Sequence, residues 1–223
     1  MTNRAENKKE PRIKKIALIF IAIILAVFVL GYGMIWYYDH FVLPTEVDNG
    51  IDITKSQLYI DHRLAIIKNS EAKLKKAKNE YDRLLAIEYL SVFLIDEGKI
   101  EEAEIYAKQI LEISPKYKDC WNYGNAIHMA HIALGRIALR RNNVNEAKNQ
   151  LLDAGHTPGS PQLDSSGPNM LLAKELLEKG ERDVVLEYLM LCGKFWTADK
   201  AKMRIWQDII KQGRIPDFGS NLL

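Results

Sequence analysis

The feature that most constrains this 223-residue chain is a run of 23 residues, 16–38, that contains no Asp, Glu, Lys, Arg or His. As a helix this run would extend about 34 Å at ~1.5 Å per residue, which is enough to cross a hydrocarbon core of about 30 Å. Its last residues, Trp36, Tyr37 and Tyr38, have amphipathic rings that suit a membrane–water interface. We therefore predict a single transmembrane helix at 16–38.

The charges on either side of this run predict its orientation. Residues 1–15 form a basic tail with a net charge of +4, which ends in Lys14 and Lys15, whereas Asp39 follows the run. The positive-inside rule then places the N-terminus in the cytoplasm and the bulk of the chain, residues 39–223, on the extracytoplasmic side of the cell membrane. A cleaved signal peptide is the alternative, but its apolar region would span only about 7–15 residues. We predict an uncleaved signal anchor, with Lys14 and Lys15 at the interface.

Charge balance limits the partners of the remaining chain. The whole chain has a net charge of +2, but residues 39–223 alone carry −2. A weakly acidic domain is a poor match for nucleic acid, so we expect none as a partner. The two cysteines, Cys120 and Cys192, are too few for a disulfide scaffold or a Cys-based zinc finger. A single bond between them stays possible outside the cytoplasm.

A repeated helical plan follows the linker predicted at 39–54. Three segments each show an apolar helix pattern, then a residue that readily adopts the left-handed conformation, then a second helix. The three turn residues are Gly98, Asn142 and Gly180. The stretches that follow them are alike, at residues 99–103, 143–147 and 181–185. Residues 55–223 therefore read as one helical domain.

The repeated residues resemble the tetratricopeptide repeat, a helix pair of 34 residues with conserved packing positions. In the first copy the matching residues are Ile87, Leu90, Ser91, Leu94, Ala103, Ala107 and Pro115. In the second they are His131, Leu134, Gly135, Ala138, Ala147 and Leu151, and in the third Leu172, Ala173, Leu176, Val185 and Leu189. Residues 121–196 are also similar to uncharacterised bacterial repeat proteins. The resemblance predicts repeats at about 84–117, 121–158 and 167–197.

The spacing of the turns departs from the regular repeat. They lie 44 and 38 residues apart rather than 34. The excess predicts an extended helix from about Asp119 to Arg141 and a long loop at 155–168. A lysine-rich helix precedes the repeats at about 56–78, and a capping helix follows within 199–213, with Met203, Trp206, Ile209 and Ile210 on one stripe. The predicted fold class is all-α: a transmembrane helix, then a short tetratricopeptide-like solenoid with a C-terminal cap.

Candidate binding residues follow from the resemblance, because repeats of this family hold extended peptides on their concave side. Register places Arg136 and Arg140 on that side in the second repeat, and Glu88 and Asp96 on the corresponding face of the first. A guanidinium fork binds carboxylates well, although Arg140 also lies in the last turn of a helix, where positive charge is favourable in any case. We predict that these four residues contact a partner.

Catalytic and metal chemistry have weaker signals. His128 and His131 share a helix face and could bind zinc with His156, but no third ligand has a fixed spacing. The 155–168 loop offers His156 and several Ser residues, yet it has no Gly-x-Ser-x-Gly motif. We predict no catalytic residue, no metal site and no cofactor.

The sequence thus predicts a membrane-tethered scaffold or adaptor that binds another protein, with the membrane contacted through residues 16–38. Two alternatives stay open. One is a hydrolase-like enzyme that uses the 155–168 loop with His128 or His156. The other is a structural membrane protein that self-assembles into homo-oligomers.

Overall fold

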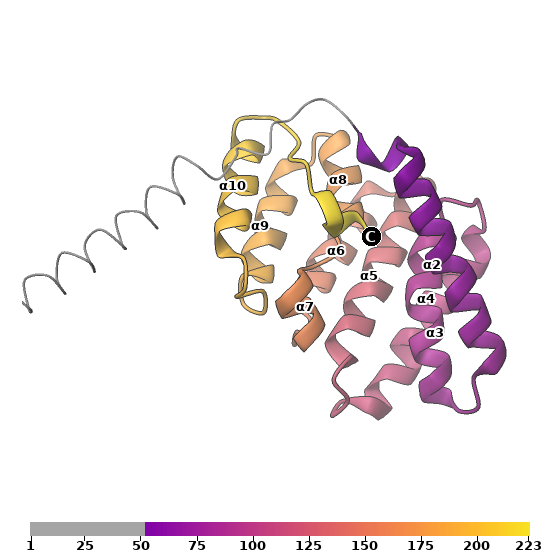
Figure 1. Ribbon diagram of the computed structural model, residues 1–223. Helices are drawn as coiled ribbons and strands as arrows, with labels where there is room; N and C mark the ends of the chain where they lie inside the picture. Colours follow the sequence, from indigo (N-terminus) through magenta and orange to yellow (C-terminus); the bar gives the residue numbers. More distant parts are fainter. Residues whose placement is uncertain (1–51) are drawn as a thin grey trace, which may run out of the picture. The chain divides into compact units, whose positions relative to one another are not determined.

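The computed structural model describes residues 52–223, and this part of the chain is helical throughout, with no strand (Figure 1). The all-α prediction is therefore confirmed for the described part. None of the helices there combines the length and the apolar character that crossing a bilayer demands. The predicted basic tail at 1–15, the anchor at 16–38 and nearly all of the linker lie outside the described residues, and with them Lys14, Lys15, Trp36, Tyr37 and Tyr38.

Three helical hairpins succeed one another along the chain. Their first helices are α3 (Glu80–Phe93), α5 (Tyr123–Arg140) and α8 (Leu171–Glu178), and their second helices are α4 (Ile100–Ile113), α6 (Val144–Gly155) and α9 (Arg182–Cys192). Successive hairpins pack on each other, α3 and α4 against α5, then α5 against α8 and α6 against α9. The helices α2 (Gln57–Lys76) and α10 (Lys200–Lys211) flank the hairpins, against α3 and α9 respectively. Short 3-10 turns complete the fold at Ile53–Lys55, Ser114–Tyr117 and Gly219–Leu222.

The three predicted turn residues all adopt the left-handed conformation. The φ angles are 74° at Gly98, 60° at Asn142 and 84° at Gly180. In each turn the next residue donates its N–H to the carbonyl five positions back, at 2.9–3.0 Å, which closes the first helix in a Schellman motif. Gly213 ends α10 in the same way, with a φ of 81°. The turn prediction is confirmed at all three hairpins.

Side-chain caps mark where several helices begin. Ser56, Asn79, Asn143 and Asp199 each accept a hydrogen bond from a backbone N–H in the first turn of α2, α3, α6 and α10. These residues satisfy donors that a helix start leaves without an intrahelical partner. The helix boundaries are thus encoded locally at both ends of the hairpins.

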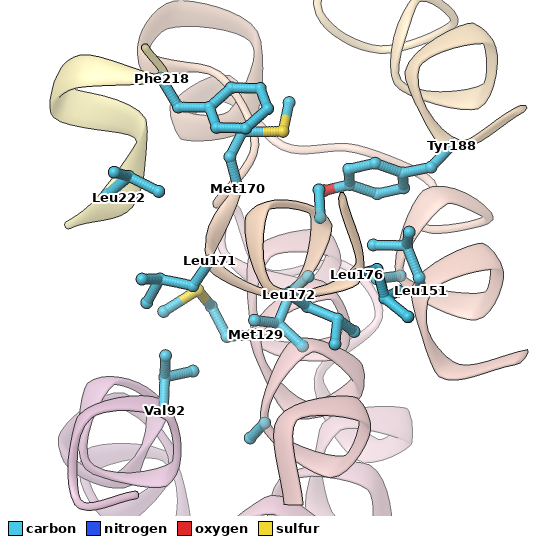
Figure 2. Packing of buried hydrophobic residues seen from close by; sticks show 14 of the residues in the cluster. Val92, Met129, Leu151, Met170, Leu171, Leu172, Leu176, Tyr188, Phe218 and Leu222 are labelled. Carbon is cyan, nitrogen blue, oxygen red and sulfur yellow. The ribbon is translucent and has the colours of Figure 1, made fainter. Parts of the chain in front are cut away.

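Small residues let the hairpins approach closely. Gly135 on α5 faces α8, and a Cβ added to it would collide with the Leu172 side chain. Ala103, Ala107 and Ala147 on the second helices are fully buried. The main buried cluster runs continuously from α2 to the end of the chain, and Figure 2 shows its central part around α8.

The chain departs from the prediction in both connections between successive hairpins. The extended helix expected from Asp119 begins at Tyr123, because a 3-10 turn and a tight bend precede it. The loop expected at 155–168 contains the short helix α7 (Pro161–Ser166). Ser160 caps α7 and Pro161 occupies its first position, a combination that favours helix initiation.

Candidate functional site

Arg136 is the centre of a charged cluster that joins the three hairpins. Its side chain projects from α5 and is only 2% exposed. Its Nε and Nη2 donate to Glu175 Oε1 of α8, at 3.0 and 2.8 Å. Its Nη1 and Nη2 donate to Asp96, which follows α3, at 3.3 and 2.6 Å, and Nη1 also donates to the Val92 carbonyl at 2.8 Å. All five N–H donors are therefore occupied within the protein.

The electrostatics of Arg136 follow from this arrangement. Burial alone would lower the pKa of its guanidinium, but the nearby charges of Glu175 and Asp96 outweigh burial and raise it above its ordinary value. Arg136 is thus a permanent cation that holds two carboxylates from neighbouring hairpins. A buried charge of this kind is tolerated only because its partners are in place.

Arg140 lies one helical turn further along α5, at the edge of the same cluster. It donates to Glu175 Oε1 at 2.9 Å, yet 40% of its side chain is exposed. Arg63 of α2 approaches from the other side and donates to Glu97 at 2.6 Å, with Asp96 at 3.7 Å. The cluster therefore presents one partly exposed guanidinium, that of Arg140, beside the buried Arg136, whereas the Arg63 side chain is only 14% exposed.

These side chains surround a polar cavity of about 270 Å³. Its lining comes from α2 and the residues before it, from α5, α8 and Asp96. Two buried polar atoms in the lining, Arg63 Nε and Glu175 Oε2, have no hydrogen-bond partner among residues 52–223. One is a donor and the other an acceptor, so a group that can both accept and donate would satisfy both.

Glu88 does not share this cavity. It is 3% exposed on α3 and accepts a hydrogen bond from Asn125 Nδ2 of α5. Burial raises the pKa of Glu88 to about 8, although the hydrogen bond from Asn125 opposes the rise. The structure therefore brings Arg136, Arg140 and Asp96 together and places Glu88 in a separate, buried contact between α3 and α5.

His128 is fully buried and both of its ring nitrogens are engaged. Nδ1 lies 3.1 Å from the Ala154 carbonyl oxygen, and Nε2 accepts the Asn169 N–H at 3.1 Å, which assigns the ring proton to Nδ1. Burial lowers its pKa to about 4. His128 thus pins α6 and the start of α8 to α5 as a neutral imidazole, with no nitrogen left for a substrate.

The other residues considered for chemistry lie apart from one another. His131 contacts Gln150 at 2.8 Å, while His156 is exposed at the end of α6. Among residues 52–223 no three His, Cys, Asp or Glu side chains gather closely enough to hold a metal ion. Cys120 and Cys192 are free thiols, and burial raises the pKa of Cys192 above its ordinary value.

Glu175 and Arg63 are the cluster residues that the sequence analysis did not single out. One signal for Glu175 was present, because charge alternates in sign from Asp96, just after α3, to Arg136 on α5 and Glu175 on α8. Their separations of 40 and 39 residues are close to the spacing of the turns. Arg63 lies on the helix before the repeats, so the repeat register carries no signal for it.

Compared with known proteins, the chain matches no family model, no curated sequence and no solved structure.

Proposed function

We propose that this chain is a tetratricopeptide-like scaffold that binds another protein on the inner face of its hairpins. The observation that supports this most is the polar cavity shared by the inner helices α5 and α8, with Arg140 exposed at its edge. Helical hairpins in succession present broad surfaces of this kind for partner proteins. The four identical helix endings and the close contact at Gly135 support the relation to such repeats.

The lining of the cavity is of mixed sign, and the exposed Arg140 at its rim is the group that would bind a carboxylate of the partner. Arg136 has no free donor, so it organises the site and does not contact the ligand. Arg140 retains free donors at the rim, and a carboxylate would form charge-assisted hydrogen bonds there. Inside the cavity, a peptide group could accept from Arg63 Nε and donate to Glu175 Oε2.

The proposed anchor at 16–38 would determine where this binding takes place. A single-pass helix would hold the domain at the cell membrane, on the extracytoplasmic side, beside membrane or extracytoplasmic partners. Confinement of both molecules to one surface raises their effective concentration, so a modest intrinsic affinity suffices. The proposed activity is therefore tethering rather than catalysis.

Photo-crosslinking in cells tests this proposal, and the chain provides a matched control. Arg140 faces the cavity, whereas the adjacent Arg141 donates to Glu104 on α4 at 2.6 Å. A photoreactive residue at position 140 should give a discrete adduct with another protein, and one at position 141 should not. Adducts that are the same at both positions, or only adducts between copies of the chain, would contradict binding at this face.

A further inference from the structure

The last ten residues, 214–223, which we call the closing segment, pack against Tyr59, residues 166–170 and Trp206, and we call this contact surface the groove. They leave α10 and cross to α2, where Tyr59 Oη donates to the Leu222 carbonyl at 2.8 Å. Figure 1 shows this segment in yellow, passing from α10 toward α2. On the way it contacts the connection between α7 and α8 through Asn221.

Asn221 is bound as a ligand would be. Its Nδ2 donates to the carbonyls of Ser166 and Pro168, at 3.0 and 3.1 Å, and its own carbonyl accepts the Met170 N–H at 2.7 Å. Its Oδ1 accepts from Lys202 Nζ of α10 at 3.3 Å. Both ends of the side-chain amide and the backbone carbonyl of Asn221 therefore form hydrogen bonds, mostly with main-chain groups of the groove.

Two apolar side chains anchor the segment on either side of Asn221. Phe218 is fully buried, with its ring edge-on to Trp206 of α10 at a centroid distance of 4.9 Å. Leu222 is 1% exposed and belongs to the same buried cluster as Met170 and Leu171 at the start of α8 (Figure 2). These two positions supply the apolar contact, and Asn221 supplies the polar specificity.

Glycines on both partners make the fit specific. Gly167, beneath Asn221, has a φ of 83°, and a Cβ there would lie 2.5 Å from Asn221 Nδ2. Gly219 has a φ of 52° with open space around it, so glycine there serves the bend between Phe218 and Asn221. The groove therefore matches the pattern aromatic, glycine, any residue, asparagine, apolar.

We propose that this groove is a peptide-binding site whose ligand is the closing segment, bound in cis within one molecule and exchangeable with the closing segment of a second copy. The proposal rests on the proposed function in that both use the inner face, where Tyr59 borders both the cavity and the groove. We infer a second copy as the occupant because its closing segment has the same sequence that the structure shows fitting the groove. Exchange of an identical element is an established route to dimers.

Exchange requires that the contacts of Phe218, Asn221 and Leu222 open and that the connection to α10 turns. Gln212 and Gly213 link α10 to the closing segment, and Gly213 is exposed, with a φ of 81°. The cis segment has a high effective concentration, because a short linker holds it at about millimolar levels. The cis form therefore dominates in dilute solution, and exchange grows at high local concentration.

Binding in trans is tested with a chain whose own segment is weakened. The full chain in mild detergent carries Phe218→Ala and Asn221→Ala, and a labelled synthetic peptide of residues 214–223 is titrated by fluorescence anisotropy. We expect saturable binding, and weakening of at least about tenfold for a peptide with Asn221→Asp, which loses both Nδ2 hydrogen bonds. Equal affinity for the two peptides, or no binding to a variant that circular dichroism shows to be folded, would overturn the proposal.

A second experiment tests exchange in a chain that keeps Phe218 and Asn221. It remains informative if the double variant does not fold. Ser220 is exposed, so a photoreactive residue there leaves the anchors intact. Isotopically heavy and light full chains are mixed at high concentration, irradiated and analysed by mass spectrometry. Heavy–light crosslinks to the groove would support exchange, and crosslinks confined to one isotope would refute it. A heterologous adduct at position 140 would stand whichever result is obtained here, so the two proposals fail separately.

Discussion

The buried carboxyl of Glu88 gives this fold a pH dependence that one substitution should remove. Glu88 is 3% exposed, and burial raises its pKa from an ordinary value of 4.5 to about 8. A carboxyl with a raised pKa in the folded state binds more protons there than in the unfolded chain. Its contribution to stability is therefore complete below pH 4.5 and is lost as the pH rises toward 8.

The size of the effect follows from the shift. One pKa unit corresponds to about 1.4 kcal/mol, so between pH 4.5 and pH 7.5 the folded state loses about 4 kcal/mol through Glu88. Glu88→Gln keeps the shape and an oxygen that accepts from Asn125, but it has no proton to lose. The variant should thus resemble the parent at pH 4.5 and exceed it in free energy of unfolding at pH 7.5.

His128 produces the opposite slope, so the comparison must be made variant against parent. Its pKa falls from 6.5 to about 4 on burial, and its contribution is therefore present above pH 6.5 and lost as the pH falls toward 4. Between pH 4.5 and 6.5 the two slopes nearly cancel in the parent. Subtracting the parent curve from the Glu88→Gln curve removes the histidine contribution, because it is common to both.

Urea unfolding followed by far-ultraviolet circular dichroism, at pH 4.5 and pH 7.5, measures this difference. Glu112→Gln is the control, since Glu112 is an exposed glutamate on the neighbouring α4. The control should change the free energy of unfolding similarly at both pH values. If Glu88→Gln also gives the same change at both, then Glu88 is not held protonated by burial and the reasoning is wrong.

Three further substitutions test the packing of the hairpins by the same unfolding assay. Arg136→Met leaves Asp96 and Glu175 without their buried cation and should cost about 3–5 kcal/mol; a loss below about 1 kcal/mol would show that the cluster is not a clamp. Gly135→Ala pushes a methyl group into α8 and should cost about 1–3 kcal/mol, and an unchanged stability would mean that the helices separate easily. Asn142→Gly should be neutral or stabilising because the φ there is 60°, whereas Asn142→Val should cost about 1–2 kcal/mol; equal effects would exclude a left-handed residue at this turn.

The parts of the fold that could be predicted are those decided by neighbours in sequence. Gly98, Asn142 and Gly180 were identified because a left-handed residue after an apolar helix ends that helix whatever lies around it. The fully buried Ala103 and Ala147 were expected from their fixed distance after the turns. Helix α7 escaped prediction because its short span of six residues shows no apolar periodicity.

The charged cluster was harder to predict because its geometry depends on contacts between hairpins. Register placed Arg136 and Arg140 on one side of α5, and the structure has both beside the cavity. Register could not show that Asp96, Glu175 and the Val92 carbonyl together occupy all donors of Arg136, because the contacts with Asp96 and Glu175 span 40 and 39 residues. Glu88 was expected to face a partner together with Asp96. In the structure it packs against Asn125 and is removed from solvent.

Both proposed binding regions already have contacts from within the chain. Asp96 and Glu175 accept hydrogen bonds from Arg136, and the closing segment fills the groove beside Tyr59. In the groove, an incoming segment from a second copy would replace internal contacts, so its net binding energy would be the difference between two similar sets of hydrogen bonds. Such a surface binds weakly in dilute solution and gains occupancy mainly from local concentration. A domain with this property functions best where it and its partner are confined together, which is the condition that a membrane anchor at 16–38 would create.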